Sequence, residues 1–163
     1  MGRALKAVEP ENLHVTLKFF AAVEPNVIPE IQGIAAKAAA QQICSQLALT
    51  GLGVFPHAQR PNVIWAGVEG AGAESLIAIA EEIEEPLEKL GFVREDRPFT
   101  PHLTLARVKA RPPEELHELL ARHAKTVFET APVEELELIR SEPGPEGSRY
   151  TALGSFPLAE RVT

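Results

Sequence analysis

The sequence has little cysteine, no long apolar run and no excess of positive charge, and each shortage excludes a class of protein. Cys44 is the only cysteine in 163 residues, so no internal disulfide can form and a reducing compartment is expected. No apolar run approaches the ~20 residues that span a bilayer. The N-terminus lacks the charged-then-apolar pattern of a signal peptide. We therefore expect a cytoplasmic protein with no membrane segment.

The charge balance is acidic, with a formal net charge of −7 at pH 7. Non-specific affinity for long nucleic acids comes mainly from neutralising phosphates, so this balance argues against a protein that coats them. Positive charge is nevertheless concentrated between Lys89 and Arg111, where basic residues outnumber acidic ones. A local positive field of this kind suits a small anionic group.

The length predicts one domain with a substantial core, or two small lobes that share one. Apolar periodicities along the chain predict alternating strands and helices. The strands are expected near Asn12–Phe20, Gln46–Phe55, Asn62–Val68, His102–Val108, Val133–Ser141 and Arg149–Pro157, and the helices near Val27–Ile43, near Glu74–Leu90 and from Pro112 onward. Pro86 is expected to bend or interrupt the last turn of the second helix.

Two His-x-Thr tripeptides, each set among alternating apolar residues, are the most informative feature of the sequence. On a strand, residues i and i+2 point to the same side. His14 and Thr16 would then project together, and so would His102 and Thr104. Two such tripeptides far apart in the chain suggest one site assembled from two parts.

The two motifs lie in repeated halves of the chain, near residues 1–70 and 71–163. Each half runs from a His-x-Thr strand through a turn and a helix to a strand, a proline-containing turn and a further strand. Repeated order of this kind indicates a duplicated unit. The second motif is preceded by a strand and a long helix, whereas only about ten residues precede the first. The first half is therefore expected to lack a strand and a helix.

Histidine exchanges a proton near neutral pH, so two facing histidines can divide acid and base work between them. Threonine hydroxyls beside them could hold the oxygens of an anion, which suits phosphodiester cleavage. The sequence has no Cys cluster and no His-x-His or His-Glu-x-x-His spacing, so we expect no metal site. His57, His117 and His123 lie outside this setting and are interpreted as structural or surface residues.

The segments Glu11-Asn12-Leu13-His14-Val15-Thr16-Leu17-Lys18-Phe19 and Pro98-Phe99-Thr100-Pro101-His102-Leu103-Thr104-Leu105-Ala106-Arg107 resemble the paired motifs of the 2H phosphoesterases. More narrowly, they resemble the RNA 2′,3′-cyclic phosphodiesterases, also called 2′-5′ RNA ligases. The resemblance implies an α+β fold, a bilobal duplicated unit in which two antiparallel sheets flank a central cleft with helices on the outside. It implies a single bilobal domain over residues 1–163, without the family's N-terminal strand and helix.

The resemblance further implies metal-independent hydrolysis of RNA 2′,3′-cyclic phosphodiester ends to 2′-phosphomonoesters, with reversible 2′-5′ RNA ligation. By position, His14 would be the proton donor to the leaving 3′-oxygen, and His102 the proton acceptor that activates water. Thr16 and Thr104 would bind the phosphate. The implied partners are RNA ends, including tRNA halves, or cyclic nucleotides. No cofactor and no obligate protein partner are implied.

Arg107 matches a family arginine five residues after the second histidine and is a candidate phosphate or substrate contact. Strict alternation from His102 puts Arg107 on the opposite face, so it reaches the site only through a bulge or twist. Lys18 shares parity with His14 and is expected to add positive charge at the rim.

Two other functions remain open. One is a cyclic phosphodiesterase for small nucleotides such as ADP-ribose cyclic phosphate. The other is a non-catalytic module that binds RNA ends or nucleotides. The short first half also predicts an exposed sheet edge, and with it lowered stability, cover from a neighbouring chain or a local rearrangement.

Overall fold

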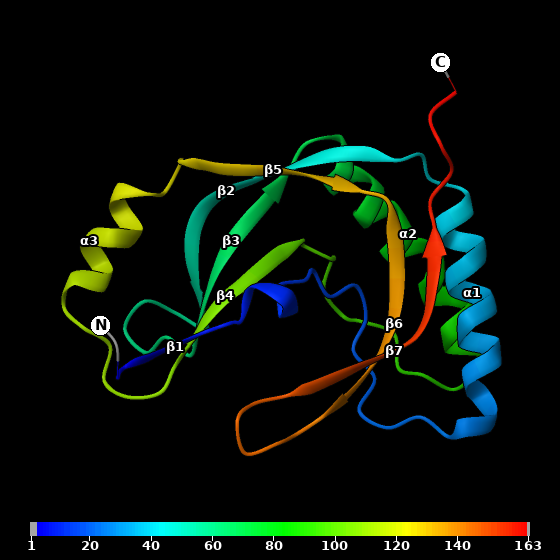
Figure 1. Cartoon of the computed structure of the whole chain (residues 1–163), viewed down its shortest axis with the longest axis horizontal. Coiled ribbons are helices and arrows are strands. Elements are labelled where there is room, and N and C mark those ends of the chain that lie inside the picture. Colours follow the sequence, from blue (N-terminus) through cyan, green and yellow to red (C-terminus); the bar gives the residue numbers. More distant parts are fainter. Residues whose placement is uncertain (1–2, 163) are drawn as a thin grey trace. The chain divides into compact units, whose positions relative to one another are not determined.

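The computed structural model describes residues 3–162, which form an α+β fold with three α-helices and two antiparallel sheets (Figure 1). The five-stranded sheet has the order β1-β4-β3-β2-β5, and β6 pairs with β7 in the two-stranded sheet. The elements are β1 (Leu5–Ala7), η1 (Pro10–Asn12), η2 (Pro25–Val27), α1 (Ile28–Ala40), β2 (Ser45–Phe55), β3 (Val63–Glu69), α2 (Ala71–Lys89), β4 (His102–Val108), α3 (Glu115–Arg122), β5 (Val127–Val133), β6 (Glu135–Glu142) and β7 (Arg149–Pro157). The predicted α+β class with two antiparallel sheets is confirmed.

The chain divides into two compact units, and each unit takes three separate segments of the sequence. Unit 1 comprises Met1–Thr16, Gln46–Ala73 and Pro101–Ala131, and unit 2 comprises Leu17–Ser45, Glu74–Thr100 and Pro132–Thr163. These boundaries cut across the repeated halves of the sequence. Both His-x-Thr motifs therefore belong to unit 1.

Unit 1 is organised by the alternation of buried and half-buried residues along β3 and β4. Ile64, Ala106 and Leu116 form a buried cluster, with Leu5, Val54, Val108 and Leu120 packed against it. Leu116 lies on α3, so this helix covers one face of the sheet. Complete burial of a large aliphatic side chain contributes about 1.5–3 kcal/mol.

Unit 2 contains α1, α2 and the β6–β7 sheet. The Gln32 amide of α1 donates a hydrogen bond to the Leu153 carbonyl of β7. The apolar stripe of α2 is buried as its periodicity predicts, at Leu76, Ile79, Ala80, Ile83 and Leu87.

Helix α2 runs without a break through Pro86 to Lys89, so the predicted interruption is wrong. The helix ends just before Gly91. Gly91 has φ +99°, its N–H donates to the Glu88 carbonyl, and the next N–H donates to Leu87. This pair of hydrogen bonds satisfies carbonyls that the last turn leaves without helical partners.

The strand expected at Asn12–Phe20 is wrong. Residues Pro10–Asn12 form a turn of 3-10 helix, and residues 13–20 belong to no helix or strand of the described chain. A strand requires a hydrogen-bonded neighbour, and the edges of β4 are already occupied by β1 and β3. Leu13, expected in the core, is 40% exposed.

The sequence analysis did not predict β1 and β5, and both strands belong to the five-stranded sheet. β1 precedes the first motif, so the expectation that the first half lacks a strand there is wrong. It is only three residues long, too short for a period of two to stand out. β5 occupies Val127–Val133, just before the strand predicted at Val133–Ser141, which the structure places at Glu135–Glu142. Within residues 3–162, no helix has the length and apolarity needed to cross a membrane.

Candidate active site

The second His-x-Thr motif lies on β4, in the interior of the five-stranded sheet. His102 is opposite Gly67 of β3, and Thr104 is opposite Trp65. Residues opposite one another in an antiparallel pair project to the same side. Leu103, between them, is 7% exposed on the other side. The predicted parity of this motif is confirmed, and we call the side that carries His102 and Thr104 the histidine face.

Two aromatic rings fix the surroundings of His102. The Phe55 ring meets the imidazole edge to face, with centroids 5.1 Å apart and an interplanar angle of 83°. The Trp65 ring lies 6.2 Å from the imidazole and 5.2 Å from Phe55. Contacts on two sides restrict the orientation of the imidazole, as a proton-transferring group requires.

The close packing of Trp65 depends on a glycine in the next strand. A Cβ placed on Gly53 would overlap the six-membered part of the indole ring, because these residues are opposite one another in the β2–β3 pair. The indole Nε1 is buried and has no hydrogen-bond partner among residues 3–162. Trp65 is therefore held by packing alone.

Arg107 reaches the histidine face because β4 contains a bulge. Trp65 pairs with Thr104, but Ile64 pairs with Ala106, so Leu105 is an extra residue on β4. The bulge reverses the parity of the residues that follow. Ala106 accordingly enters the core cluster beside Ile64, and Arg107, opposite Val63, is exposed on the same side as Thr104. The structure thus contains the bulge that Arg107 needs in order to lie on the same face as His102 and Thr104.

The first motif lies in an irregular segment directly after η1. His14 and Thr16 are exposed, and Val15 between them is half-buried. The imidazole Nδ1 lies 2.6 Å from the Asn12 carbonyl oxygen. A carbonyl only accepts hydrogen bonds, so Nδ1 carries the proton of this contact. This hydrogen bond therefore helps to fix the orientation of the imidazole ring.

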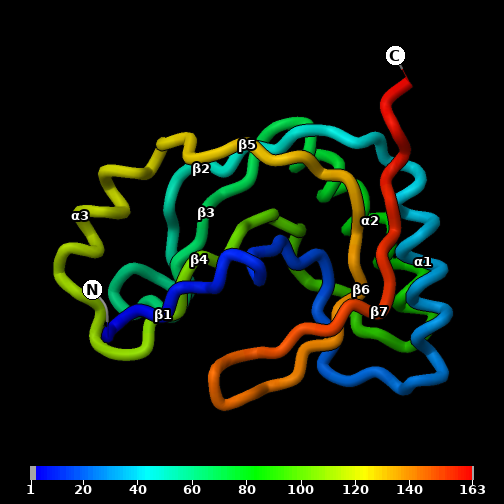
Figure 2. The backbone as a smooth tube through the Cα atoms, in the orientation of Figure 1, coloured from blue at the N-terminus to red at the C-terminus, as the bar shows by residue number. Residues whose placement is uncertain are grey.

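Strand β1 brings the first motif toward the second. Its residues pair with β4 from Leu5 opposite Val108 to Ala7 opposite Ala106, and the Val8 N–H donates to the Leu105 carbonyl at 2.8 Å. The tube in Figure 2 follows β1 beside β4 and then turns through η1. All five predicted site residues therefore belong to the same compact unit: His14, Thr16, His102, Thr104 and Arg107.

Lys18 is engaged in an internal ion pair instead of adding charge at the rim. Its Nζ lies 3.0 Å from the Glu84 carboxylate and 3.6 Å from that of Glu95, and the Lys18 side chain is only 5% exposed. Nζ also donates to the Val93 carbonyl. All of these residues belong to unit 2. The expectation for Lys18 is corrected, because neighbouring carboxylates neutralise its charge.

The remaining histidines are placed as interpreted from the sequence. His123 ends α3, where its Nδ1 lies 3.1 Å from the Thr126 hydroxyl, and His57 and His117 are exposed. No group of three or more His, Cys, Asp or Glu residues within 3–162 could hold a metal ion.

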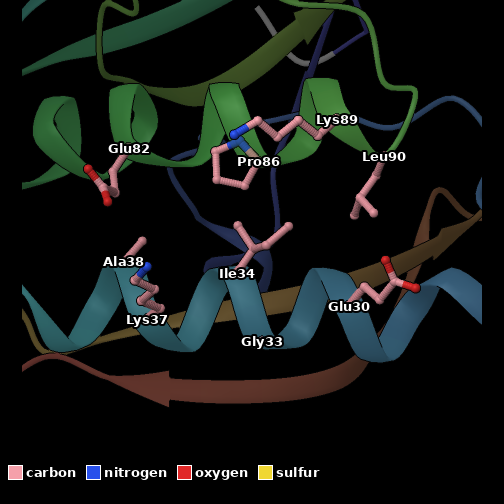
Figure 3. Close-up of a pocket in the computed structure, with 9 residues that line it drawn as sticks. All are labelled: Glu30, Gly33, Ile34, Lys37, Ala38, Glu82, Pro86, Lys89 and Leu90. Carbon is pink, nitrogen blue, oxygen red and sulfur yellow. The ribbon is translucent and has the colours of Figure 1, made fainter.

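A separate cavity of roughly 450 Å³ lies in unit 2 between α1 and α2. Figure 3 shows Ile34 and Ala38 of α1 facing Pro86 of α2, with charged side chains around them. Its lining contains no histidine, serine or threonine. This cavity therefore does not match the chemistry of the two motifs.

Sequence reasoning missed Phe55, Trp65 and Gly53 as parts of the site. The glycine did carry a signal, because a glycine inside a strand often marks a bulge or a close approach. Neighbouring Gly51 has φ +70° at the irregularity of β2, and Gly53 accommodates the indole. The aromatic residues gave no signal that separated them from ordinary sheet packing.

Comparison with known proteins connects this geometry to a family. A family model described as the 2′-5′ RNA ligase superfamily matches residues 3–145. The RNA 2′,3′-cyclic phosphodiesterase of Archaeoglobus fulgidus is 35% identical over 152 residues, covering 93% of this chain and 83% of that protein. Its namesake from Thermus thermophilus is 36% identical over 163 residues, covering 96% of this chain and 77% of that protein.

Solved structures resemble the fold over nearly all of the chain. The crystal structure of TT0787 of Thermus thermophilus has a TM-score of 0.82 and 32% identity, covering 99% of this chain and 86% of that one. The structure of E. coli LigT complexed with 3′-AMP has a TM-score of 0.73 and 25% identity, covering 95% of this chain and 82% of that one.

Proposed function

Because the chain belongs to the 2′-5′ RNA ligase superfamily, we propose that it hydrolyses the 2′,3′-cyclic phosphate ends of RNA to 2′-phosphomonoesters. Curated relatives covering most of the chain are named RNA 2′,3′-cyclic phosphodiesterases. The observation that carries the proposal is the bulge in β4, which gives Arg107 the same face as His102 and Thr104. Two proton-transferring groups, two hydroxyls and one cation in a single unit suit an anionic phosphodiester.

The two histidines divide the proton transfers of the reaction. His102, with its ring orientation restricted by Phe55 and Trp65, accepts a proton from water, whose oxygen forms a new bond to phosphorus. The bond from phosphorus to the 3′-oxygen breaks, and His14 donates a proton to that oxygen. The Asn12 carbonyl at Nδ1 supports this role, because it fixes the tautomer and leaves the transfer to Nε2. General acid–base catalysis of this kind contributes typically ~10²–10⁴-fold.

Thr16, Thr104 and Arg107 stabilise the charge that develops on phosphorus. The hydroxyls of the two threonines donate hydrogen bonds to the non-bridging oxygens. No ion pair or side-chain hydrogen bond within residues 3–162 involves Arg107, so its guanidinium is available to an anion. Its planar fork matches the geometry of a phosphate. Donors already directed at the developing charge lower the barrier without reorganising.

The same geometry supports 2′-5′ ligation. The 5′-hydroxyl of a second RNA strand takes the place of water: its oxygen bonds to phosphorus and its proton passes to His102, while the bond from phosphorus to the 3′-oxygen breaks and His14 donates a proton to that oxygen. The product carries a 2′-5′ linkage. The superfamily description, which names 2′-5′ RNA ligases, supports this activity. The lone Cys44 fits a reducing, cytoplasmic setting for both reactions.

The proposal is tested with adenosine 2′,3′-cyclic phosphate and the dinucleotide ApA 2′,3′-cyclic phosphate. We expect both to yield 2′-phosphates, identified by ³¹P NMR, at a rate that EDTA does not change. His14→Ala and His102→Ala should each lower kcat at least ~100-fold. His117→Ala, which alters an exposed histidine of α3, is the matched control and should retain the native rate.

The binding-module alternative gives a different result. Binding of 2′-AMP, measured by calorimetry, should largely survive either substitution, because binding does not require proton transfer. If the native chain binds nucleotides but hydrolyses neither substrate, it is a binding module. If His14→Ala and His102→Ala both hydrolyse at the native rate, the two-histidine mechanism is wrong.

A further inference from the structure

Lys109 adds a second cation to the histidine face, just beyond the end of β4. The strand ends at Val108, but its pairing continues for one more residue, because the Lys109 N–H donates to the Ala4 carbonyl at 2.8 Å. Side chains therefore still alternate between the two sides at this point. Val108 packs against the core cluster on the other side of the sheet. Arg107 and Lys109, which flank Val108, both project to the histidine face, and both are exposed.

The ammonium group of Lys109 is available to an anion. Among the residues that the structure describes, none forms an ion pair with it. The chain carries a net charge of −7, so two exposed cations two residues apart on the face of the candidate site are not a general feature of its surface. A local positive field of this kind attracts an anionic substrate.

The spacing along the chain separates the phosphate that Lys109 can reach from the scissile phosphate. In the proposed function, Arg107 and Thr104 stabilise the charge on the scissile phosphate. Lys109 lies two residues beyond Arg107, roughly 7 Å further at the usual rise of a strand. One nucleotide of an extended RNA strand spans such a distance. An anion bound at Lys109 would therefore be the neighbouring phosphate of the same strand.

We infer that Lys109 binds the phosphodiester that precedes the terminal nucleotide of an RNA bearing a 2′,3′-cyclic phosphate. The inference rests on the proposed function and names its substrate class more closely. A cyclic mononucleotide has no such phosphate, whereas every RNA end of two nucleotides or more has one. Lys109 is thus a specificity-determining contact that favours RNA ends over mononucleotides.

The test compares Lys109→Gln with the native chain on adenosine 2′,3′-cyclic phosphate and on ApA 2′,3′-cyclic phosphate. We expect the variant to lower kcat/KM for the dinucleotide roughly five- to tenfold more than it lowers kcat/KM for the mononucleotide. The slope of log kcat/KM against log salt concentration for the dinucleotide should flatten by about 0.7, the value for one lost phosphate contact on a single strand. Lys109→Arg, which keeps the charge, should restore both.

Lys125→Gln is the matched control, because it removes the same charge from an exposed lysine of unit 1 that lies outside all helices and strands. It should leave the dinucleotide preference unchanged. Equal effects of Lys109→Gln on both substrates, no effect on either, or the same loss in Lys125→Gln would overturn the inference while leaving the proposed function intact. Failure of the native chain to hydrolyse either substrate would overturn the proposed function and the inference with it.

Discussion

The two His-x-Thr motifs have the same letters but different structural support. The second lies on β4 between two hydrogen-bonded neighbours, with Leu103 buried behind it. The first lies in an irregular segment, where a 3-10 turn and the hydrogen bond between His14 and the Asn12 carbonyl determine its local geometry. The comparison teaches that the same tripeptide can be supported by a sheet in one place and by a local turn and backbone hydrogen bond in another.

The difference matters for how each histidine is held. The rings of Phe55 and Trp65 pack around His102. His14 is exposed, and its ring makes a short hydrogen bond to a backbone atom two residues away. Substitutions in the core should therefore affect the second motif strongly and the first motif weakly. Four predictions test this contrast, beginning with the largest effect.

Leu103→Ala and Leu13→Ala remove the same atoms beside the two motifs. Leu103 is 7% exposed and Leu13 is 40% exposed. We expect Leu103→Ala to lower the free energy of unfolding by about 3 kcal/mol, because it leaves a cavity behind β4. Leu13→Ala should cost less than about 1 kcal/mol, because water already reaches that side chain. Urea denaturation measures both, and equal losses would remove the contrast between the motifs.

Lys18→Met tests the ion pair that follows the first motif in the sequence. Lys18 and Glu84 have side chains that are 5% and 14% exposed, so removing one partner leaves a largely buried charge. We expect a loss of about 2 kcal/mol in the free energy of unfolding. The double variant Lys18→Met/Glu84→Met should recover much of this loss. An unchanged denaturation midpoint in Lys18→Met would show that the pair contributes nothing.

Much of this architecture could be predicted from the sequence. The predictions failed where a feature depends on pairing between strands that are distant in the sequence. The periodicities of α2 and β4 are local, so burial at Ile79 and Leu103 was predictable. The sequence predicted a strand at Asn12–Phe20 that does not form. Alternating apolar residues do not show whether a neighbouring strand is available to pair with them. The sequence showed that Arg107 needs a bulge or twist to reach the site, but it did not predict the bulge at Leu105. The register of a strand depends on the strand that pairs with it.

The side chains that surround the site were the least predictable part. Alternation predicted that Lys18 points to the same side as His14, but its ion-pair partners lie in α2 and in the loop that follows. The two histidines and two threonines were predictable because the same tripeptide occurs twice in similar settings.

Gly53→Ala tests the packing that supports the second motif. The added Cβ would overlap the Trp65 ring, which in turn contacts His102. Overpacking of this kind costs typically about 1–3 kcal/mol, and displacement of the imidazole should lower kcat about tenfold.

Gly33→Ala is the control, because nothing lies within 4 Å of its Cβ position. In the middle of α1 it should stabilise by about 0.5–1 kcal/mol. Native kcat in Gly53→Ala would separate Trp65 from the function of His102.

The smallest effect is expected at Glu85, whose exposed pair with Lys89 contrasts with the buried pair of Lys18 and Glu84. A hydrogen bond from Lys89, together with its positive charge, lowers the pKa of the Glu85 carboxyl below the usual value, and Arg94 adds a weaker attraction. A carboxyl whose pKa is lower in the folded chain stabilises it above the unfolded-state pKa, and this contribution is lost as the pH falls through the folded-state pKa. Lys89→Met should therefore raise the Glu85 pKa in an NMR titration of the side-chain carboxyl. The small difference in Tm between native and variant chains should vanish at low pH. Solvent screens both exposed groups, so a loss of stability in Lys89→Met as large as that in Lys18→Met would contradict the view that burial decides which ion pairs support the fold.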